Sequence, residues 1–93
     1  MDKQEFIQLV NGKLKLIRIE NDLSQDKMSE IIGLSKKTLV EIEKGRRSLT
    51  WTGAVCVVTL FEDSDIIQMT FGDDINEIIK TIAFTHYNNS SSF

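Results

Sequence analysis

Two consecutive lysines, Lys36 and Lys37, follow directly after Ser35. Serine is a favourable N-cap, so both lysines are expected in the first turn of a short helix. The helix dipole disfavours cations at a helix N-terminus. Residues that are locally unfavourable in this way are typical of a functional site. Two ammonium groups beside free backbone N–H groups also attract anions. The segment is therefore predicted to contact an anionic partner.

The exposed face of the same helix has mixed chemistry. Leu39 and Ile42 are expected to point into the core. The residues left on the opposite face are Lys36, Lys37, Val40 and Glu41. Lysine donates to guanine O6 or N7, glutamate accepts from cytosine N4, and an apolar group can touch a thymine methyl. This face is suited to base edges in a DNA major groove; the alternative is a solvated face with a weak Lys37–Glu41 pair.

Polar residues around this helix are suited to contacts with DNA phosphates. They are Gln25, Ser35, Lys44, Arg46 and Arg47. Gln25 is also placed to brace a side chain of the helix that begins after Ser35. Phosphate contacts position a protein on the duplex but carry no sequence information directly.

Two very short helices must position these residues. The first is expected to begin after Ser24 and to end at Gly33, and the second to end at Gly45. Helices of about eight residues are marginal in isolation, so tertiary contacts must hold both. Two short helices joined by a glycine-containing turn are typical of a helix-turn-helix, predicted here over residues 24–44.

The remaining elements are also predicted to be helical. Apolar residues at three- and four-residue steps predict a helix over about residues 3–21, in the order Phe6, Leu9, Val10, Leu14 and Ile17. Residues 50–61 are predicted to form a buried helix, although their valines favour a strand by propensity. Residues 62–65 are predicted to be a turn, and the segment that follows, to Phe71, a short helix with a strand as the alternative.

A last helix is predicted over about residues 74–87, with Ile75, Ile78, Ile79 and Ile82 on one stripe. This stripe either folds back onto the domain or forms a dimer interface, and we favour dimerisation. Residues 88–93 are predicted to be a disordered tail.

Charge is distributed unevenly along the chain. The net charge of −3 does not suggest a nucleic-acid partner, but residues 1–47 hold ten of the eleven basic residues against eight acids. Residues 48–93 hold Lys80 and six acids. A polyanion would be attracted to the first half and repelled by the second.

The composition gives little support for catalysis. The single cysteine, Cys56, lies in an apolar run and is predicted to be a buried, reduced thiol. His86 is the only histidine, and the acidic residues after Phe61 lack the spacing of a calcium loop. Trp51 is expected to close the core behind the exposed helix. We therefore expect no enzyme activity, no cofactor, no metal and no small-molecule ligand.

A set of motifs in the first two thirds of the chain resembles the Xre/Cro family of lambda-repressor-like helix-turn-helix domains. These motifs are Leu14-x-x-x-Arg18, Leu23-Ser24-Gln25, Met28-Ser29, Gly33-Leu34-Ser35, Thr38-Leu39 and Ile42-Glu43-Lys44-Gly45-Arg46-Arg47. The resemblance covers about residues 13–61. It implies an all-α, five-helix DNA-binding domain over residues 1–71, with an additional C-terminal helix over 72–87.

The resemblance also bears on individual residues. It implies that Gln25, Lys36, Lys37 and Glu41 face DNA. It further suggests a structural ion pair between Arg18 and Glu43. Two departures from the family pattern are Ser29, at a position usually held by alanine, and the absence of a proline after Arg47.

These observations together predict a cytoplasmic transcriptional regulator of the Xre/Cro type. We expect a repressor that binds operator DNA as a homodimer. The sequence shows no secretory signal and no apolar stretch long enough to cross a membrane. The alternative is a protein-interaction module on the same scaffold, such as an antitoxin or an adaptor.

Overall fold

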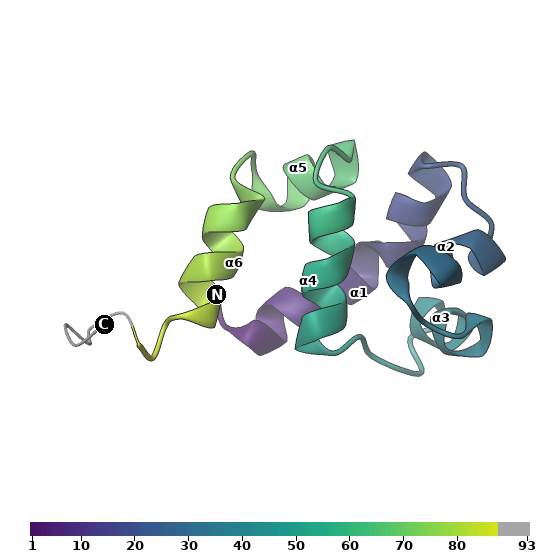
Figure 1. The fold of residues 1–93 in the computed structure, drawn as a ribbon, viewed down its shortest axis with the longest axis horizontal. Coiled ribbons are helices and arrows are strands. Elements are labelled where there is room, and N and C mark those ends of the chain that lie inside the picture. The colour runs from purple at the N-terminus through teal and green to yellow at the C-terminus, as the bar shows by residue number, and fades with distance from the viewer. Residues whose placement is uncertain (88–93) are drawn as a thin grey trace.

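A computed structural model describes residues 1–87, and this part of the chain consists of six helices without a strand (Figure 1). The helices are α1 (Lys3–Glu20), α2 (Gln25–Ile32), α3 (Lys36–Glu43), α4 (Trp51–Leu60), α5 (Asp65–Phe71) and α6 (Ile75–Ala83). The predicted all-α fold is confirmed. The predicted disordered tail, residues 88–93, lies outside the described residues.

Polar N-caps determine where most of the helices begin. Five of these caps lie in extended backbone and accept a hydrogen bond from a backbone N–H of the first turn; they are Asp2, Ser24, Ser35, Thr50 and Ser64. Each cap satisfies one of the N–H groups that a helix end leaves without a partner. The two serines predicted to start the helix-turn-helix helices therefore do so.

Both helices of the motif end at a left-handed glycine. Gly33 has φ 75° and Gly45 has φ 76°. The residue after each glycine donates a backbone hydrogen bond to the carbonyl five residues earlier. Leu34 donates to Ser29 and Arg46 donates to Glu41, each at 2.9 Å. These Schellman-type ends need positive φ, which glycine adopts without steric cost.

The valine-rich segment forms helix α4 because tertiary packing outweighs its strand propensity. Ala54, Val57 and Val58 are fully buried on one side of this helix. Cys56 is only partly buried, so its predicted burial was wrong. An apolar run alone did not indicate which side of the helix would face the core.

The helices are arranged along α1, which packs against α3, α4 and α5. Helices α2 and α3 lie at one end of the molecule and α6 at the other, with α4 between them (Figure 1). None of the described helices is long and apolar enough to cross a membrane.

An aromatic cluster joins the start of α1 to α4 and α5. The Phe6 ring is fully buried, with its centroid 5.4 Å from that of Trp51 and 5.1 Å from that of Phe71. The Lys3 Nζ lies 5.3 Å from the centroid of the Trp51 ring. Trp51 therefore closes the core against the start of α1. The sequence had suggested a position behind α3, and this prediction was wrong.

Burial in α1 and α2 differs from a simple apolar pattern. In α2, Ser29 is buried and Ile31 is 46% exposed. Ser29 fits because its hydroxyl donates to the Asp26 carbonyl at 2.8 Å, which satisfies the buried polar group. In α1, Ile7 is buried and Leu9 is partly exposed.

Helix α6 ends at Ala83, four residues before its predicted end. The residues after it form turns, and Phe84 and Tyr87 are more than half exposed. They are weak helix formers, and too little packing compensates for this. Within the helix, Ile75 and Ile82 are buried in the domain core.

Ile78 and Ile79 are only partly buried against that core. Two of the four isoleucines of the predicted stripe, Ile75 and Ile82, are thus part of the core of the same domain. Dimerisation through the rest of it stays a prediction.

Candidate nucleic-acid interface

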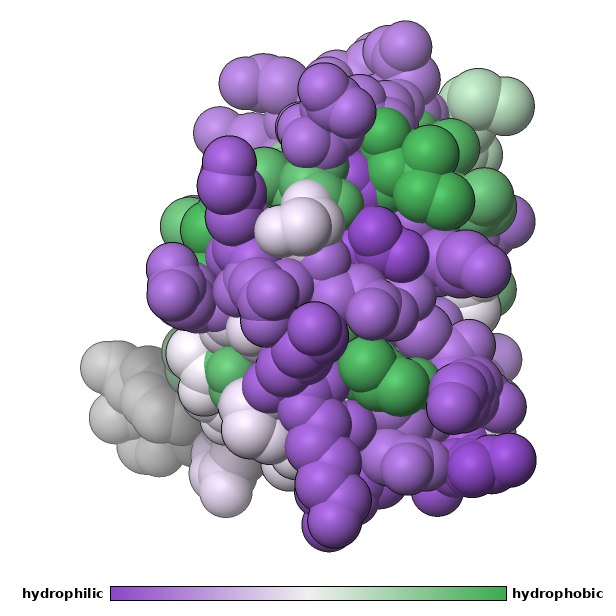
Figure 2. Space-filling model, turned by 90° about the vertical axis from the view of Figure 1, so that its right-hand side faces the viewer, coloured by the Kyte–Doolittle hydropathy of each residue, from purple (hydrophilic) through white to green (hydrophobic). Residues whose placement is uncertain are grey.

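Helix α3 exposes the face that the sequence assigned to base contacts. Leu39 and Ile42 are 0% and 3% exposed and fix this helix on the core. Lys36 and Lys37 are exposed, and Val40 and Glu41 are half-buried. The end of the molecule formed by α2 and α3 is mainly hydrophilic, with separate apolar patches (Figure 2). All four candidate base-contacting residues therefore reach the surface of one short helix.

One candidate base-contacting lysine has a partner within the protein. The Lys36 Nζ lies 3.4 Å from the Asp26 Oδ2, and both side chains are more than half exposed. An exposed pair of this kind contributes little to stability. Its effect is to hold the Lys36 ammonium between the start of α2 and the start of α3.

The end of α3 is attached to α1 by a bidentate ion pair. Arg18 donates from Nε to the Glu43 Oε2 at 2.7 Å and from Nη2 to the Glu43 Oε1 at 3.0 Å. Arg18 also donates to the Leu23 carbonyl at 3.0 Å, and Gln25 donates to the Glu43 Oε1 at 3.2 Å. This network connects α1, the start of α2 and the end of α3, so it fixes the angle at which α3 leaves the domain.

Burial and hydrogen bonding act in opposite directions on the Glu43 carboxylate. Burial by itself raises the pKa of Glu43, but hydrogen bonds from Arg18 and Gln25 and the charges of Arg18 and Lys15 outweigh it. The net pKa of Glu43 is below its ordinary value. The hydrogen bond with Glu43 raises the pKa of Arg18. Both groups are therefore charged at neutral pH, and Gln25 braces α3 through the same carboxylate.

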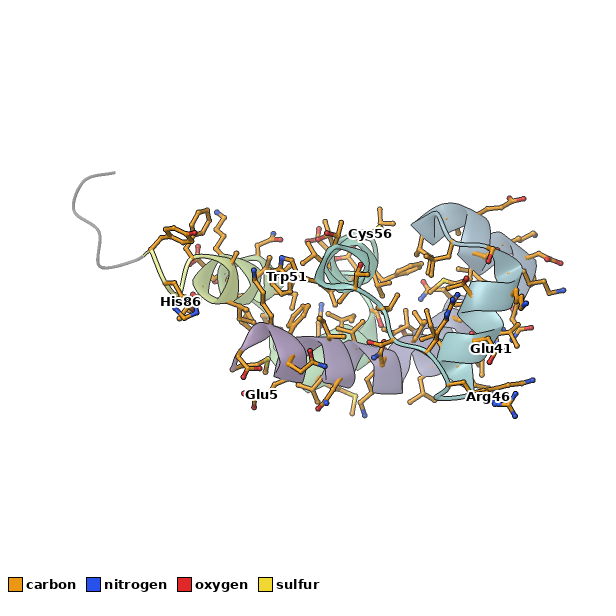
Figure 3. The ribbon with its side chains drawn as sticks, turned by 90° about the horizontal axis from the view of Figure 1, so that it is seen from below. Glu5, Glu41, Arg46, Trp51, Cys56 and His86 are labelled. Carbon is orange, nitrogen blue, oxygen red and sulfur yellow. The ribbon has the colours of Figure 1, made fainter. Side chains whose placement is uncertain are left out.

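The segment after α3 brings the candidate phosphate-contacting arginines next to the helix. Arg47 donates from Nη1 to the Thr38 Oγ1 at 3.0 Å, and the Ser35 hydroxyl donates to the same oxygen at 2.9 Å. Arg46 is exposed and lies with Glu41 at the α3 end of the molecule (Figure 3). Lys44 is also exposed. The candidate phosphate contacts thus surround α3 at both of its ends.

A residue that the sequence analysis did not single out holds this segment in place. Asn11 of α1 donates from Nδ2 to the Ser48 Oγ at 2.8 Å and accepts from the Leu49 N–H at 2.9 Å. The partners are 37 and 38 residues apart in sequence, so no local pattern indicates them. An asparagine in a polar stretch of α1 gave no signal that would separate it from a solvated side chain.

The other residues considered for chemistry do not assemble into a site. Within residues 1–87, no three or more His, Cys, Asp or Glu side chains are grouped as metal ligands. Cys56 lies on α4 near the middle of the molecule, whereas His86 lies beyond the end of α6, at the end opposite α3 (Figure 3). Of the acidic residues near Ser64, Glu62 and Asp63 lie in a turn and Asp65 begins α5. Glu20, at the end of α1, accepts hydrogen bonds from the Ser64 hydroxyl and the Ile66 N–H.

Comparison with protein families identifies the class of this site. Residues 14–50 match the family model for helix-turn-helix. The matched segment includes residues 14–20 of α1, both helices of the motif and the loop up to the cap of α4. This part of the chain is similar to Xre/Cro-like helix-turn-helix domains, a family of DNA-binding transcription regulators. Searches among curated proteins and among solved structures found no match.

Proposed function

We propose that the protein is a sequence-specific, double-stranded DNA-binding transcriptional regulator of the Xre/Cro type, which represses transcription by occupying an operator. The observation that carries the proposal is the exposed face of α3 (Lys36, Lys37, Val40 and Glu41), held at a fixed angle by the Arg18–Glu43 ion pair. A helix presented in this way fits a major groove. Its role is to bind and not to catalyse, and the cytoplasm is the expected location.

Phosphate contacts are assigned to the residues that surround this face. They are Gln25, Ser35, Lys44, Arg46 and Arg47. Gln25 and Arg47 already donate hydrogen bonds within the protein, so each would share or exchange a partner on binding. The exposed Lys44 and Arg46 need no such exchange.

We further propose that two copies bind together, with α6 contributing to the contact. Helix-turn-helix dimers place their recognition helices about 34 Å apart, which corresponds to half-sites one turn apart. The partly exposed Ile78 and Ile79 are at the end of the molecule opposite α3, so a contact there leaves α3 free for DNA.

The base-contact assignment is tested by substitutions on α3. Lys36→Ala or Glu41→Ala should cost about 1–3 kcal/mol of binding free energy on a selected duplex and relax the base preference at one position. Arg46→Ala should weaken binding to all duplexes alike. Fluorescence anisotropy with a selected and a random duplex measures both effects, and Lys13→Ala, on α1, is the control.

Two outcomes would contradict the proposed function. Unchanged discrimination in Lys36→Ala and Glu41→Ala would mean that α3 does not contact bases. If the intact chain showed no salt-dependent binding to any duplex, the regulator proposal would fail, because phosphate contacts must make the affinity depend on salt. A stable heteromeric partner in that case would support a protein-interaction module.

Asp26 should limit the affinity of the protein for every duplex. Its carboxylate lies at the start of α2 beside Lys36, where it opposes phosphate binding and competes for the ammonium. Asp26→Asn should strengthen binding to selected and random duplexes several-fold and lower discrimination between them, at a stability cost below about 1 kcal/mol. The matched control is Asp63→Asn, between α4 and α5. Weaker binding in Asp26→Asn would show instead that the ion pair holds Lys36 in its binding position.

A further inference from the structure

A groove lies outside the exposed face of α3, between α1 and the segment that follows α3. Its volume is about 710 Å³. The α1 side contributes mainly polar residues, Gln4, Gln8, Asn11 and Lys15, and the other side is formed by the end of α3 and the segment from Gly45 to Ser48.

The charges that line the groove are mainly positive. Its cations are Lys15, Arg46 and Arg47. The one carboxylate in its lining, Glu43, is 4% exposed and already accepts two hydrogen bonds from Arg18. Within the described part of the chain, neither Lys15 nor Arg46 has an ion-pair partner. In a chain of net charge −3, this groove therefore has a local excess of positive charge, although the charge of Lys15 also acts on Glu43.

The two walls of the groove are held together. Asn11 bonds to both Ser48 and Leu49, as described above, and the Ser48 hydroxyl also donates to the Leu49 carbonyl at 2.7 Å. This fixes the segment that carries Arg46 beside α1. The groove is thus present before any ligand binds, and little conformational entropy is lost when an anion enters it.

The shape of the groove favours a chain of phosphates over a single anion. Gln4, Gln8 and Lys15 follow one another along one side of α1, over about 16 Å at the helical rise of 1.5 Å per residue. A DNA strand carries one phosphate charge per 3.4 Å of duplex axis, so several phosphates fit this length. The end of the groove at Lys15 and Arg46 adjoins the end of α3.

We propose that this groove is a second phosphate-binding site, in which Lys15 neutralises a phosphate of the same duplex that α3 enters and Gln8 and Gln4 donate hydrogen bonds further along the strand. This inference rests on the proposed function. It extends the DNA contact from the helix-turn-helix along α1, through Lys15 and on to Gln8 and Gln4, which lie before the matched residues 14–50. The added contacts are to the backbone, so they increase affinity for all sequences alike.

The test is the salt dependence of DNA binding by Lys15→Gln. Compared with the intact chain, this variant should bind selected and random duplexes several-fold more weakly, and the slope of log K against log salt should decrease by about 0.9 for the lost phosphate contact. Lys13→Gln is the matched control, because Lys13 is also on α1 but does not line the groove. Hydroxyl-radical footprinting should show that Lys15→Gln loses protection on one stretch of backbone.

The outcomes separate this inference from the proposed function. If the intact chain binds DNA and Lys15→Gln keeps its affinity, slope and footprint, the groove is not a phosphate site and the regulator proposal stands. If the intact chain binds no duplex, both proposals fail. If Lys15→Gln abolishes binding of inorganic phosphate but leaves the DNA slope unchanged, the groove holds a free anion and the assignment to DNA is wrong.

Discussion

Replacing Glu43 with alanine is expected to lower the free energy of unfolding by about 3 kcal/mol. The substitution removes the acceptor of two Arg18 hydrogen bonds and leaves a guanidinium whose side chain is only 14% exposed without its counter-charge. It also removes the acceptor of Gln25. Urea denaturation followed by the fluorescence of Trp51, the only tryptophan, measures the loss. A loss below about 0.5 kcal/mol would show that solvent replaces the pair without cost.

The pH dependence of stability distinguishes the contribution of the Glu43 charge from that of its side-chain packing. Because folding lowers the pKa of Glu43, its ionised form stabilises the folded state fully above the unfolded pKa, near 4.3, and this contribution is lost as the pH falls through the folded pKa. The intact chain should therefore exceed Glu43→Gln in stability by a constant amount above about pH 5, and the difference should shrink below about pH 4. A difference that does not change with pH would assign the effect to packing.

Replacing Phe6 with alanine is expected to cost about 4 kcal/mol of unfolding free energy, a large part of the stability of a small domain. Phe6 is fully buried and contacts the rings of Trp51 and Phe71, so the cavity would lie where α1, α4 and α5 meet. The emission of Trp51 should shift as the ring loses its neighbour. Denaturation in urea gives the magnitude.

Two control variants test whether the loss of stability in Phe6→Ala comes from the buried position of Phe6. Phe6→Leu fills most of the volume and should cost less than about 1.5 kcal/mol. Leu16→Ala, on the exposed side of α1, should change stability by less than about 0.5 kcal/mol. Equal losses in Phe6→Ala and Leu16→Ala would mean that the start of α1 is not packed beneath α4 and α5.

The parts of the structure that follow from local chemistry could be predicted from the sequence. Ser24 and Ser35 as N-caps and Gly33 and Gly45 as ends each depend on a few neighbouring residues. The same is true of the inward side of α3, where Leu39 fixes the periodicity. The spacing of the motif also indicates which side of α3 is exposed.

Features that depend on distant contacts could not be predicted in this way. Asn11 bonds to residues 37 and 38 positions away, and a single asparagine carries no sign of such partners. The half-burial of Cys56 and the exposure of Ile31 depend on which side of a helix meets a neighbour. The early end of α6 reflects missing packing beyond Ala83, which composition does not report.

Helix α1 extends from the α6 end of the molecule to the ion pair beneath α3. Its 18 residues make a rod about 27 Å long. If α1 is tilted by about 10° about its end near α6, its other end moves by about 5 Å over this length. If two copies bind together, as proposed, a tilt of α1 of this size would move α3 by more than the spacing of one base pair, and the fit to two half-sites would depend on the stiffness of this one helix.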